Sequence, residues 1–155
     1  MNLTIRKIRK TDIPYLKDVL NSIELFPSDM LEEMVSDFFN NPETTEFWFT
    51  AVENEIPLAI GYCAPEKLTE GTFNLYAIGV KADKQGKGIG NRMMKFLEEK
   101  LRKEGQRILL VETSGTEDLK LTRKFYENLN YTKEAIIRDF WSEGDDKVIY
   151  WKRLN

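Results

Sequence analysis

The stretch Gln85-Gly86-Lys87-Gly88-Ile89-Gly90-Asn91 follows an apolar segment with strand-like alternation and opens a long amphipathic segment with helical periodicity. Its three glycines permit positive φ angles and leave backbone amides uncovered by a Cβ. A helix that begins at Gly88 directs its unpaired N–H groups and positive dipole end toward this turn, and Lys87 and Arg92 add positive charge. The turn therefore predicts an anion site for a phosphate-bearing ligand, and the alternative is a glycine-rich turn without one.

The segments on either side of this turn form one β-α-β unit. Residues 72–80 read as a strand, and the following helix has one apolar stripe, composed of Ile89, Met93, Phe96, Leu97 and Leu101. Residues 107–113 contain the continuous apolar run Ile108-Leu109-Leu110-Val111, typical of a strand that is buried on both faces in a parallel pair. Glu112 ends this predicted strand, where a carboxylate needs water, a partner or a catalytic task.

The rest of the chain alternates between helical and strand-like patterns. In chain order we expect a strand, two helices, a hairpin, a helix and two strands, at residues 3–8, 12–23, 28–39, 47–64, 117–130, 131–141 and 147–154. These elements indicate an α/β fold, and the length of 155 residues fits a single domain, residues 1–155.

The composition excludes several classes of protein. With 41% hydrophobic residues and interspersed charge at 32%, the chain is typical of a globular protein rather than a disordered one. The balance of 23 basic and 26 acidic residues gives no basic face for nucleic acid or an anionic membrane. No apolar run approaches the ~20 residues that span a bilayer. The single cysteine, Cys63, and the absence of a signal-peptide core lead us to expect a cytoplasmic protein.

The chain contains no histidine. This absence excludes Ser-His and Cys-His nucleophilic systems and the commonest zinc ligand sets. A general base must then be Asp, Glu, Lys, Tyr, a terminus or water, and we expect no metal.

The order of strand, Gln85-x-x-Gly88-x-Gly90 turn, helix, buried strand and a helix with Phe125-Tyr126 resembles the GCN5-related N-acetyltransferase (GNAT) family over essentially the whole chain. The resemblance implies a mixed, twisted sheet of about seven strands flanked by about four helices, in the order β-α-α-β-β-β-α-β-α-β-β. It also implies that the turn binds the pyrophosphate of acetyl-CoA through backbone amides, while the preceding strand pairs with the pantetheine arm. The implied cofactor-binding residues are Ile78, Gly79, Val80, Gln85, Gly86, Lys87, Gly88, Ile89, Gly90 and Asn91.

The same resemblance implies two catalytic residues. The pattern at residues 124–131 looks like the second signature of the family, whose tyrosine lies near the thioester sulfur, and Tyr126 occupies that position. Residues 139–146 are similar to the closing region of ribosomal-protein N-terminal acetyltransferases, in which a glutamate at the end of the fifth strand is the base. Glu112 matches that glutamate.

The chain departs from the family pattern at three positions. Leu119 and Thr122 stand where the family often has Asn and Ala, and Asn130 stands where it often has Gly. The missing asparagine removes one expected cofactor contact.

The expected function is N-acetyl transfer from acetyl-CoA to a primary amine of a small molecule, a protein N-terminus or a lysine, by direct attack in a ternary complex. In this reading Glu112 is the base and Tyr126 the acid, in a monomer or homodimer that binds neither nucleic acid nor membrane. The structural alternatives are a strand-end salt bridge for Glu112 and a packed core tyrosine for Tyr126. A non-catalytic acyl-CoA sensor or interaction module on the same fold is the rival function.

Two other phosphate-binding motifs fit less well. Gly86-x-Gly88-x-Gly90 after a strand, with Glu112 about twenty residues on, imitates a dinucleotide fingerprint. Asn91 stands where its third glycine would fall, and further β-α-β repeats are missing. A Walker-type loop is excluded because Gly88, rather than Ser or Thr, follows Lys87.

Overall fold

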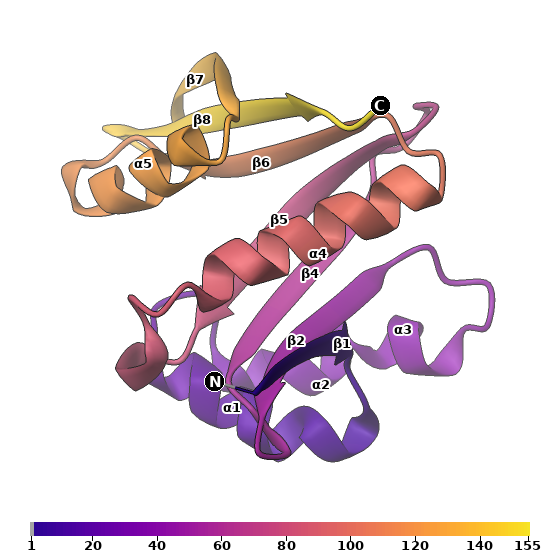
Figure 1. Cartoon of the computed structure of the whole chain (residues 1–155). Helices are drawn as coiled ribbons and strands as arrows, with labels where there is room; N and C mark the ends of the chain where they lie inside the picture. The colour runs from indigo at the N-terminus through magenta and orange to yellow at the C-terminus, as the bar shows by residue number, and fades with distance from the viewer. Residues whose placement is uncertain (1) are drawn as a thin grey trace.

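The computed structural model describes residues 2–155 and contains eight strands. They are β1 (Leu3–Lys7), β2 (Phe47–Glu53), β3 (Ile56–Pro57), β4 (Ala59–Pro65), β5 (Thr72–Val80), β6 (Ile108–Ser114), β7 (Thr132–Ser142) and β8 (Asp145–Arg153). They form one open sheet in the order β1-β2-β4-β5-β6-β8-β7, with β3 paired to β2 (Figure 1). Only β5 and β6 are parallel among these pairs. The expected mixed α/β sheet is confirmed.

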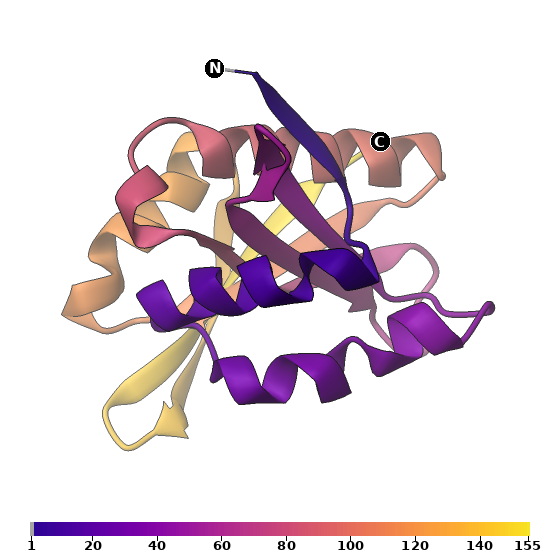
Figure 2. The ribbon, with the colours of Figure 1, turned by 90° about the horizontal axis from the view of Figure 1, so that it is seen from below.

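Five α-helices cover the two faces of the sheet. They are α1 (Ile13–Ser22), α2 (Leu31–Met34), α3 (Ser36–Asn40), α4 (Ile89–Lys103) and α5 (Lys120–Asn128). The first three lie along one face and α4 lies on the other, as Figure 2 shows. Side chains of α5 pack into the same hydrophobic cluster as α4. The sheet therefore separates two apolar cores.

The core beneath α4 is built from the apolar stripe of that helix. Ile89, Met93 and Leu97 are buried against β-strand residues such as Phe49 and Leu109. Spacings of three and four residues place these side chains on one face, as the sequence pattern predicts. The packing fixes the start of α4, and with it the glycine turn, against the middle of the sheet.

The core on the other face joins α1 and α2 to the sheet through Leu16, Leu31, Trp48 and Ile60. The single helix predicted over residues 28–39 is divided into α2 and α3. Val35, at the junction, has φ −90° and ψ −1°, outside ideal helical geometry. The Ser36 hydroxyl donates to the Glu33 carbonyl at 2.8 Å, a local bond of the kind that bends helices.

The parallel pair β5–β6 is short. Its register runs from Thr72 opposite Ile108 to Leu75 opposite Val111, after which the strands diverge. Figure 1 shows the resulting wedge, which opens toward the start of α4 and toward α5. A second feature of β5 is a bulge, because Leu75 and Ala77 oppose the adjacent residues Cys63 and Tyr62 and leave Tyr76 as the extra residue.

Candidate active site

The glycine turn presents free backbone amides. Gly86 and Gly88 have φ angles of +75° and +82°, and a Cβ at either would meet nothing within 4 Å. Helix α4 begins at Ile89 without a side-chain cap, and its first backbone bond runs from the Arg92 amide to the Gly88 carbonyl at 3.1 Å. The amides that precede Arg92 in this helix therefore lack intrahelical acceptors and, with the helix dipole, favour an anion.

A groove of about 650 Å³ runs from this turn to α5. Its walls contain all the expected cofactor-binding residues except Lys87 and Ile89. The lining residues are Ile78, Gly79, Val80, Gln85, Gly86, Gly88, Gly90, Asn91, Leu121, Thr122, Phe125, Tyr126, Asn128 and Leu129. Lys87 is exposed, and the Ile89 side chain is buried in the core. The structure thus brings the predicted turn and strand together along one groove.

The end of β5 offers to this groove a backbone edge that pairs with no other strand. The Lys81 amide donates to the Leu58 carbonyl on the β4 side at 2.8 Å. Because alternate residues face opposite neighbours, Val80 and Ile78 direct their N–H and C=O groups toward the wedge. The Val80 carbonyl accepts from Gln85 Nε2 at 3.0 Å, which agrees with this direction. An extended chain with amide groups could pair with this edge.

Gly79 lets the loop after α1 approach β5. A Cβ at this position would lie 2.4 Å from Ile23 Cδ1, closer than real carbon atoms approach. The glycine therefore permits the Ile23–Leu25 loop to close one side of the site.

Tyr126 reaches the site from α5. The centroid of its ring lies 5.2 Å from the ring centroid of Phe125 and 5.7 Å from that of Tyr150. Within residues 2–155 its hydroxyl makes no hydrogen bond, although the side chain borders the groove. Burial raises the pKa of Tyr126 above its usual value, so the hydroxyl keeps its proton at neutral pH.

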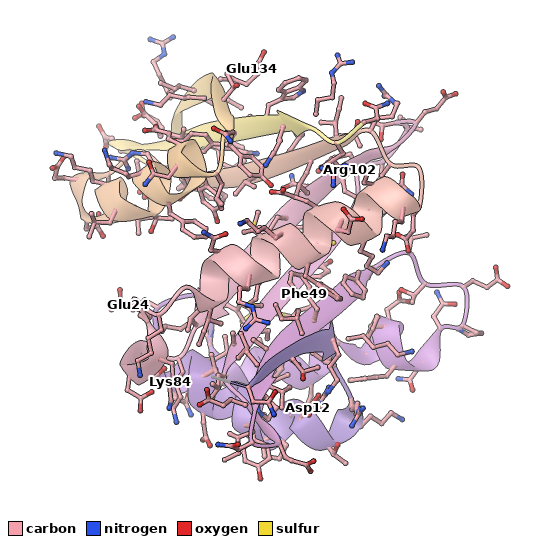
Figure 3. All side chains as sticks on the ribbon, viewed as in Figure 1. Asp12, Glu24, Phe49, Lys84, Arg102 and Glu134 are labelled. Carbon is pink, nitrogen blue, oxygen red and sulfur yellow. The ribbon has the colours of Figure 1, made fainter. Side chains whose placement is uncertain are left out.

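A second cavity of about 280 Å³ adjoins the first at Tyr126, Thr122 and the end of β5. Its other walls include Tyr76 and Glu112, together with Glu24 from the loop after α1. Figure 3 shows Glu24 at the same end of the molecule as Lys84, just before the glycine turn. Because Tyr126 borders both cavities, a ligand in the first cavity and a ligand in the second could meet at this side chain.

Glu112 lies on β6, two residues before the end of the strand at Ser114. Its Oε1 is 2.8 Å from Lys147 Nζ, and its Oε2 accepts from Asn74 Nδ2 at 2.8 Å. The ion pair expected in the structural alternative is present, yet Glu112 also borders the second cavity. The two interpretations of Glu112 are therefore compatible.

Sequence patterns do not predict three residues that lie at or near the second cavity, namely Glu66, Asn74 and Tyr76. Asn74 is fully buried on β5 and donates from Nδ2 to Glu66 Oε1 at 2.9 Å. The Tyr76 hydroxyl donates to the same Glu66 oxygen at 2.8 Å. The available signal was Asn74 itself, because a polar residue inside an apolar strand requires a buried partner.

The acidic residues of the β7–β8 hairpin mostly hold the hairpin together. Asp139 Oδ1 accepts from the Gly144 amide at 2.9 Å, and Asp146 Oδ1 accepts from the Asp139 amide at 3.0 Å. Asp145 accepts from the Ser114 hydroxyl and links the hairpin to β6. These bonds place the hairpin beside Glu112 and Lys147. The Lys147 Nζ lies 4.1 Å from the centroid of the Phe140 ring.

The three departures from the family pattern also have places in the structure. Leu119 borders the second cavity and Thr122 borders both. Asn130 follows α5 with φ +69°, a left-handed conformation that asparagine tolerates better than most residues.

Two properties of the described chain, residues 2–155, concern metals and membranes. Within it, no group of three His, Cys, Asp or Glu side chains is arranged to hold a metal ion. None of its helices combines the length and apolar character that a membrane span requires.

Comparison with known proteins gives a family profile and many similar structures. A profile for the acetyltransferase (GNAT) domain matches residues 43–133. No curated protein matches significantly. A structure from Desulfovibrio desulfuricans, assigned to the GNAT family of acetyltransferases, superposes with a TM-score of 0.91 and 28% identity, covering 99% of both chains.

Two more distant structures share the fold. The ribosomal-protein-S18-alanine N-acetyltransferase from Escherichia coli has a TM-score of 0.78 and 20% identity, covering 99% of this chain and 94% of that one. An aminoglycoside 6'-N-acetyltransferase complexed with coenzyme A has a TM-score of 0.79 and 15% identity, covering 98% of this chain and 97% of that one.

Proposed function

Because the chain belongs to the GNAT family of acetyltransferases, we propose that it transfers an acetyl group from acetyl-CoA to a primary amine by direct attack in a ternary complex. The amine belongs to a small molecule, a protein N-terminus or a lysine side chain. The observation that carries this proposal is the meeting of two cavities at Tyr126, one of which begins at the free amides of α4.

The groove has the donors and acceptors that a CoA ester requires. The amides at the start of α4 would bind the pyrophosphate, and the Ile78 and Val80 edge would pair with the amides of pantetheine. A fold relative with bound coenzyme A supports the same choice of ligand. Acetyl-CoA supplies the activated acetyl thioester, and the residues of this chain orient it and move protons.

Tyr126 is the proposed acid that protonates the leaving thiolate. In water, the pKa of a tyrosine is near 10 and that of a thiol is near 8.5. Proton transfer from the tyrosine to the thiolate therefore costs about 2 kcal/mol. Burial raises the pKa of Tyr126 and so makes it a weaker acid. The same low-polarity surroundings also destabilise a thiolate, so the two effects oppose each other.

Glu112 is the proposed group that receives the proton of the amine. Direct proton transfer from an ammonium group with a pKa near 10.4 to a glutamate with a reference pKa near 4.3 would cost about 8 kcal/mol. The proposed route therefore runs through ordered water, or transfers the proton after the nitrogen has begun to bond to the carbonyl carbon. Lys147 and Asn74 hold the carboxylate at the cavity wall for either route.

Binding and turnover test this proposal separately. Acetyl-CoA is expected to raise the melting temperature, whereas NAD is not, because a ligand stabilises the state that binds it. Release of CoA thiol is then measured with spermidine, kanamycin, a lysine peptide and peptides with free N-termini. Amine-dependent release supports transfer. Binding of acetyl-CoA without release above background for any amine would favour the non-catalytic sensor.

A further inference from the structure

The second cavity combines an apolar inner end with a polar rim. Leu75 and Val111 border it and are buried. They are also the last pair in the parallel register of β5 and β6, so they lie where the two strands begin to diverge. Glu24 and Tyr76 border the same cavity but are exposed. An apolar group therefore fits the inner end of the cavity, and a polar group fits its rim.

Leu119 adds another apolar wall to this cavity. It ends the short 3₁₀-helix η4 (Glu117–Leu119), which directly precedes α5, and it borders the second cavity. The asparagine that the GNAT family often has at this position carries an amide, and a buried amide requires hydrogen-bond partners. A leucine has no such requirement, so this wall favours contact with an apolar group of a ligand.

The second cavity begins where the cofactor groove ends. Thr122 and Tyr126 border both cavities, and the proposed reaction places the thioester sulfur at Tyr126. The carbonyl carbon of a CoA ester is bonded to that sulfur. The acyl chain therefore starts at the junction of the two cavities and can extend toward Leu75, Val111 and Leu119.

The second cavity is larger than an acetyl group requires. Its volume of about 280 Å³ equals that of about nine water molecules in the liquid. An acetyl group places one methyl carbon beyond the carbonyl, whereas a butyryl group adds two methylene groups to it. The cavity has room for these two methylene groups at its inner end and for an amine at its rim.

We infer that the inner end of the second cavity binds the acyl chain of the CoA ester, that propionyl-CoA and butyryl-CoA bind more tightly than acetyl-CoA, and that Leu119 determines this preference. The inference rests on the proposed function for the identity of the ester. The transfer step keeps its chemistry. The amine nitrogen bonds to the carbonyl carbon and loses a proton, while the C–S bond breaks and the thiolate takes up a proton.

Calorimetric titration with CoA esters tests this pocket without turnover, because no amine is present. The dissociation constants of acetyl-CoA, propionyl-CoA and butyryl-CoA are compared on the same protein. Each methylene group that is buried improves affinity by about fourfold. We therefore expect propionyl-CoA to bind about fourfold, and butyryl-CoA roughly tenfold or more, as tightly as acetyl-CoA.

Substitutions at Leu119 test the assignment of the wall. Leu119→Asn should reduce the advantage of butyryl-CoA over acetyl-CoA to about threefold or less, because an amide replaces the apolar contact. Leu119→Met keeps an apolar side chain of similar size and should retain most of the advantage. The matched control is Leu68→Asn, the same chemical change at an exposed residue of the loop after β4 that borders neither of the two described cavities. It should leave the advantage unchanged.

The inference is overturned if butyryl-CoA binds the original protein no more tightly than acetyl-CoA, or if Leu119→Asn keeps the full advantage. Equal affinities for the three esters together with amine-dependent CoA release would overturn this inference and leave the proposed function standing. The expected order of affinities without CoA release from any amine would instead refute the proposed function and leave the acyl pocket standing.

Discussion

Tyr126 combines a tightly packed ring with a hydroxyl that has no partner in residues 2–155. Phenylalanine keeps the ring and removes the proton donor. We expect Tyr126→Phe to lower kcat by about 10²-fold or more, since general acids contribute about 10²–10⁴-fold. The dissociation constant for acetyl-CoA, measured by calorimetry, should change less than about twofold because ring contacts persist. An unchanged kcat would remove Tyr126 from the mechanism.

Glu112 is expected to matter most when the amine arrives protonated. Glu112→Gln should lower kcat/KM by about 10²-fold at pH 7. Part of the loss should return as the pH rises, because a growing fraction of the amine is then already neutral. The check is a pH profile of both proteins, with the exposed Glu117→Gln as control. A loss that stays constant across pH would count against proton acceptance by Glu112.

The individual site residues differ in how far the sequence predicts them. Glu112 and Tyr126 stand at positions that the family motifs mark, and the structure places both at the second cavity. Asn74, Glu66 and Lys147 belong to no motif. Their association with Glu112 depends on the register of β5, β6 and β8 and on a bulge, which hydrophobic periodicity does not encode.

The glycine turn before α4 offers a matched pair of substitutions. Gly88 has φ +82°, so Gly88→Ala should cost about 1 kcal/mol of stability and weaken acetyl-CoA binding by distorting the amides. Gly90 has no positive φ, and its Cβ would lie 3.4 Å from the Phe125 ring, near ordinary contact. Gly90→Ala should therefore change both quantities much less.

Urea denaturation and calorimetric titration with acetyl-CoA measure the two effects of these substitutions. Equal affinities in the Gly88→Ala and Gly90→Ala variants would show that the backbone conformation of Gly88 does not shape the binding site.

At the level of elements, the pattern of residues 72–113 predicts the β-α-β unit because α4 and β6 have clear periodicities. The breaks at Val35 and Leu58 were not predicted. Each depends on a local event rather than on a change of hydrophobic period. The helix bends at Val35, and the register against β2 changes near Leu58, whose amide still donates to the Ala51 carbonyl at 2.8 Å. The divergence of β5 and β6 after Leu75 also has no signal in the apolar pattern.

The whole molecule depends in part on a paired carboxylate between β1 and α1. Asp12 accepts two bonds from the Arg6 guanidinium, at 2.8 and 3.0 Å, and one from the Arg9 amide at 2.7 Å. Burial alone would raise the pKa of Asp12, but the hydrogen bonds from Arg6 and Arg9 outweigh it and the net shift is downward. The ionised carboxylate therefore stabilises the fold.

Asp12→Asn should lower the free energy of unfolding by about 2 kcal/mol at pH 7, because the bonds to a charged group are lost or weakened. A folded-state pKa below the ordinary value of about 3.9 means that this contribution is complete above that pH and disappears as the pH falls through the folded-state value. Urea titrations at pH 7 and pH 3 should show the difference narrowing. The exposed Asp18→Asn serves as control, and a difference independent of pH would contradict the assignment.

The resemblance to the GNAT family and the predicted fold class are both confirmed at the scale of the whole chain. The acceptor was not predictable in the same way. Glu112, the proposed proton acceptor, and the side chains that surround it come from the loop after β4 and from three strands, whereas the turn that indicates the cofactor is one continuous segment.

The most direct test of the central claim is a crystal structure of the protein with coenzyme A. The account predicts the pyrophosphate at about 2.9 Å from amides at the start of α4 and the sulfur beside the Tyr126 hydroxyl, within the wedge between β5 and β6. Coenzyme A bound elsewhere, or a sulfur atom directed away from Tyr126, would contradict it.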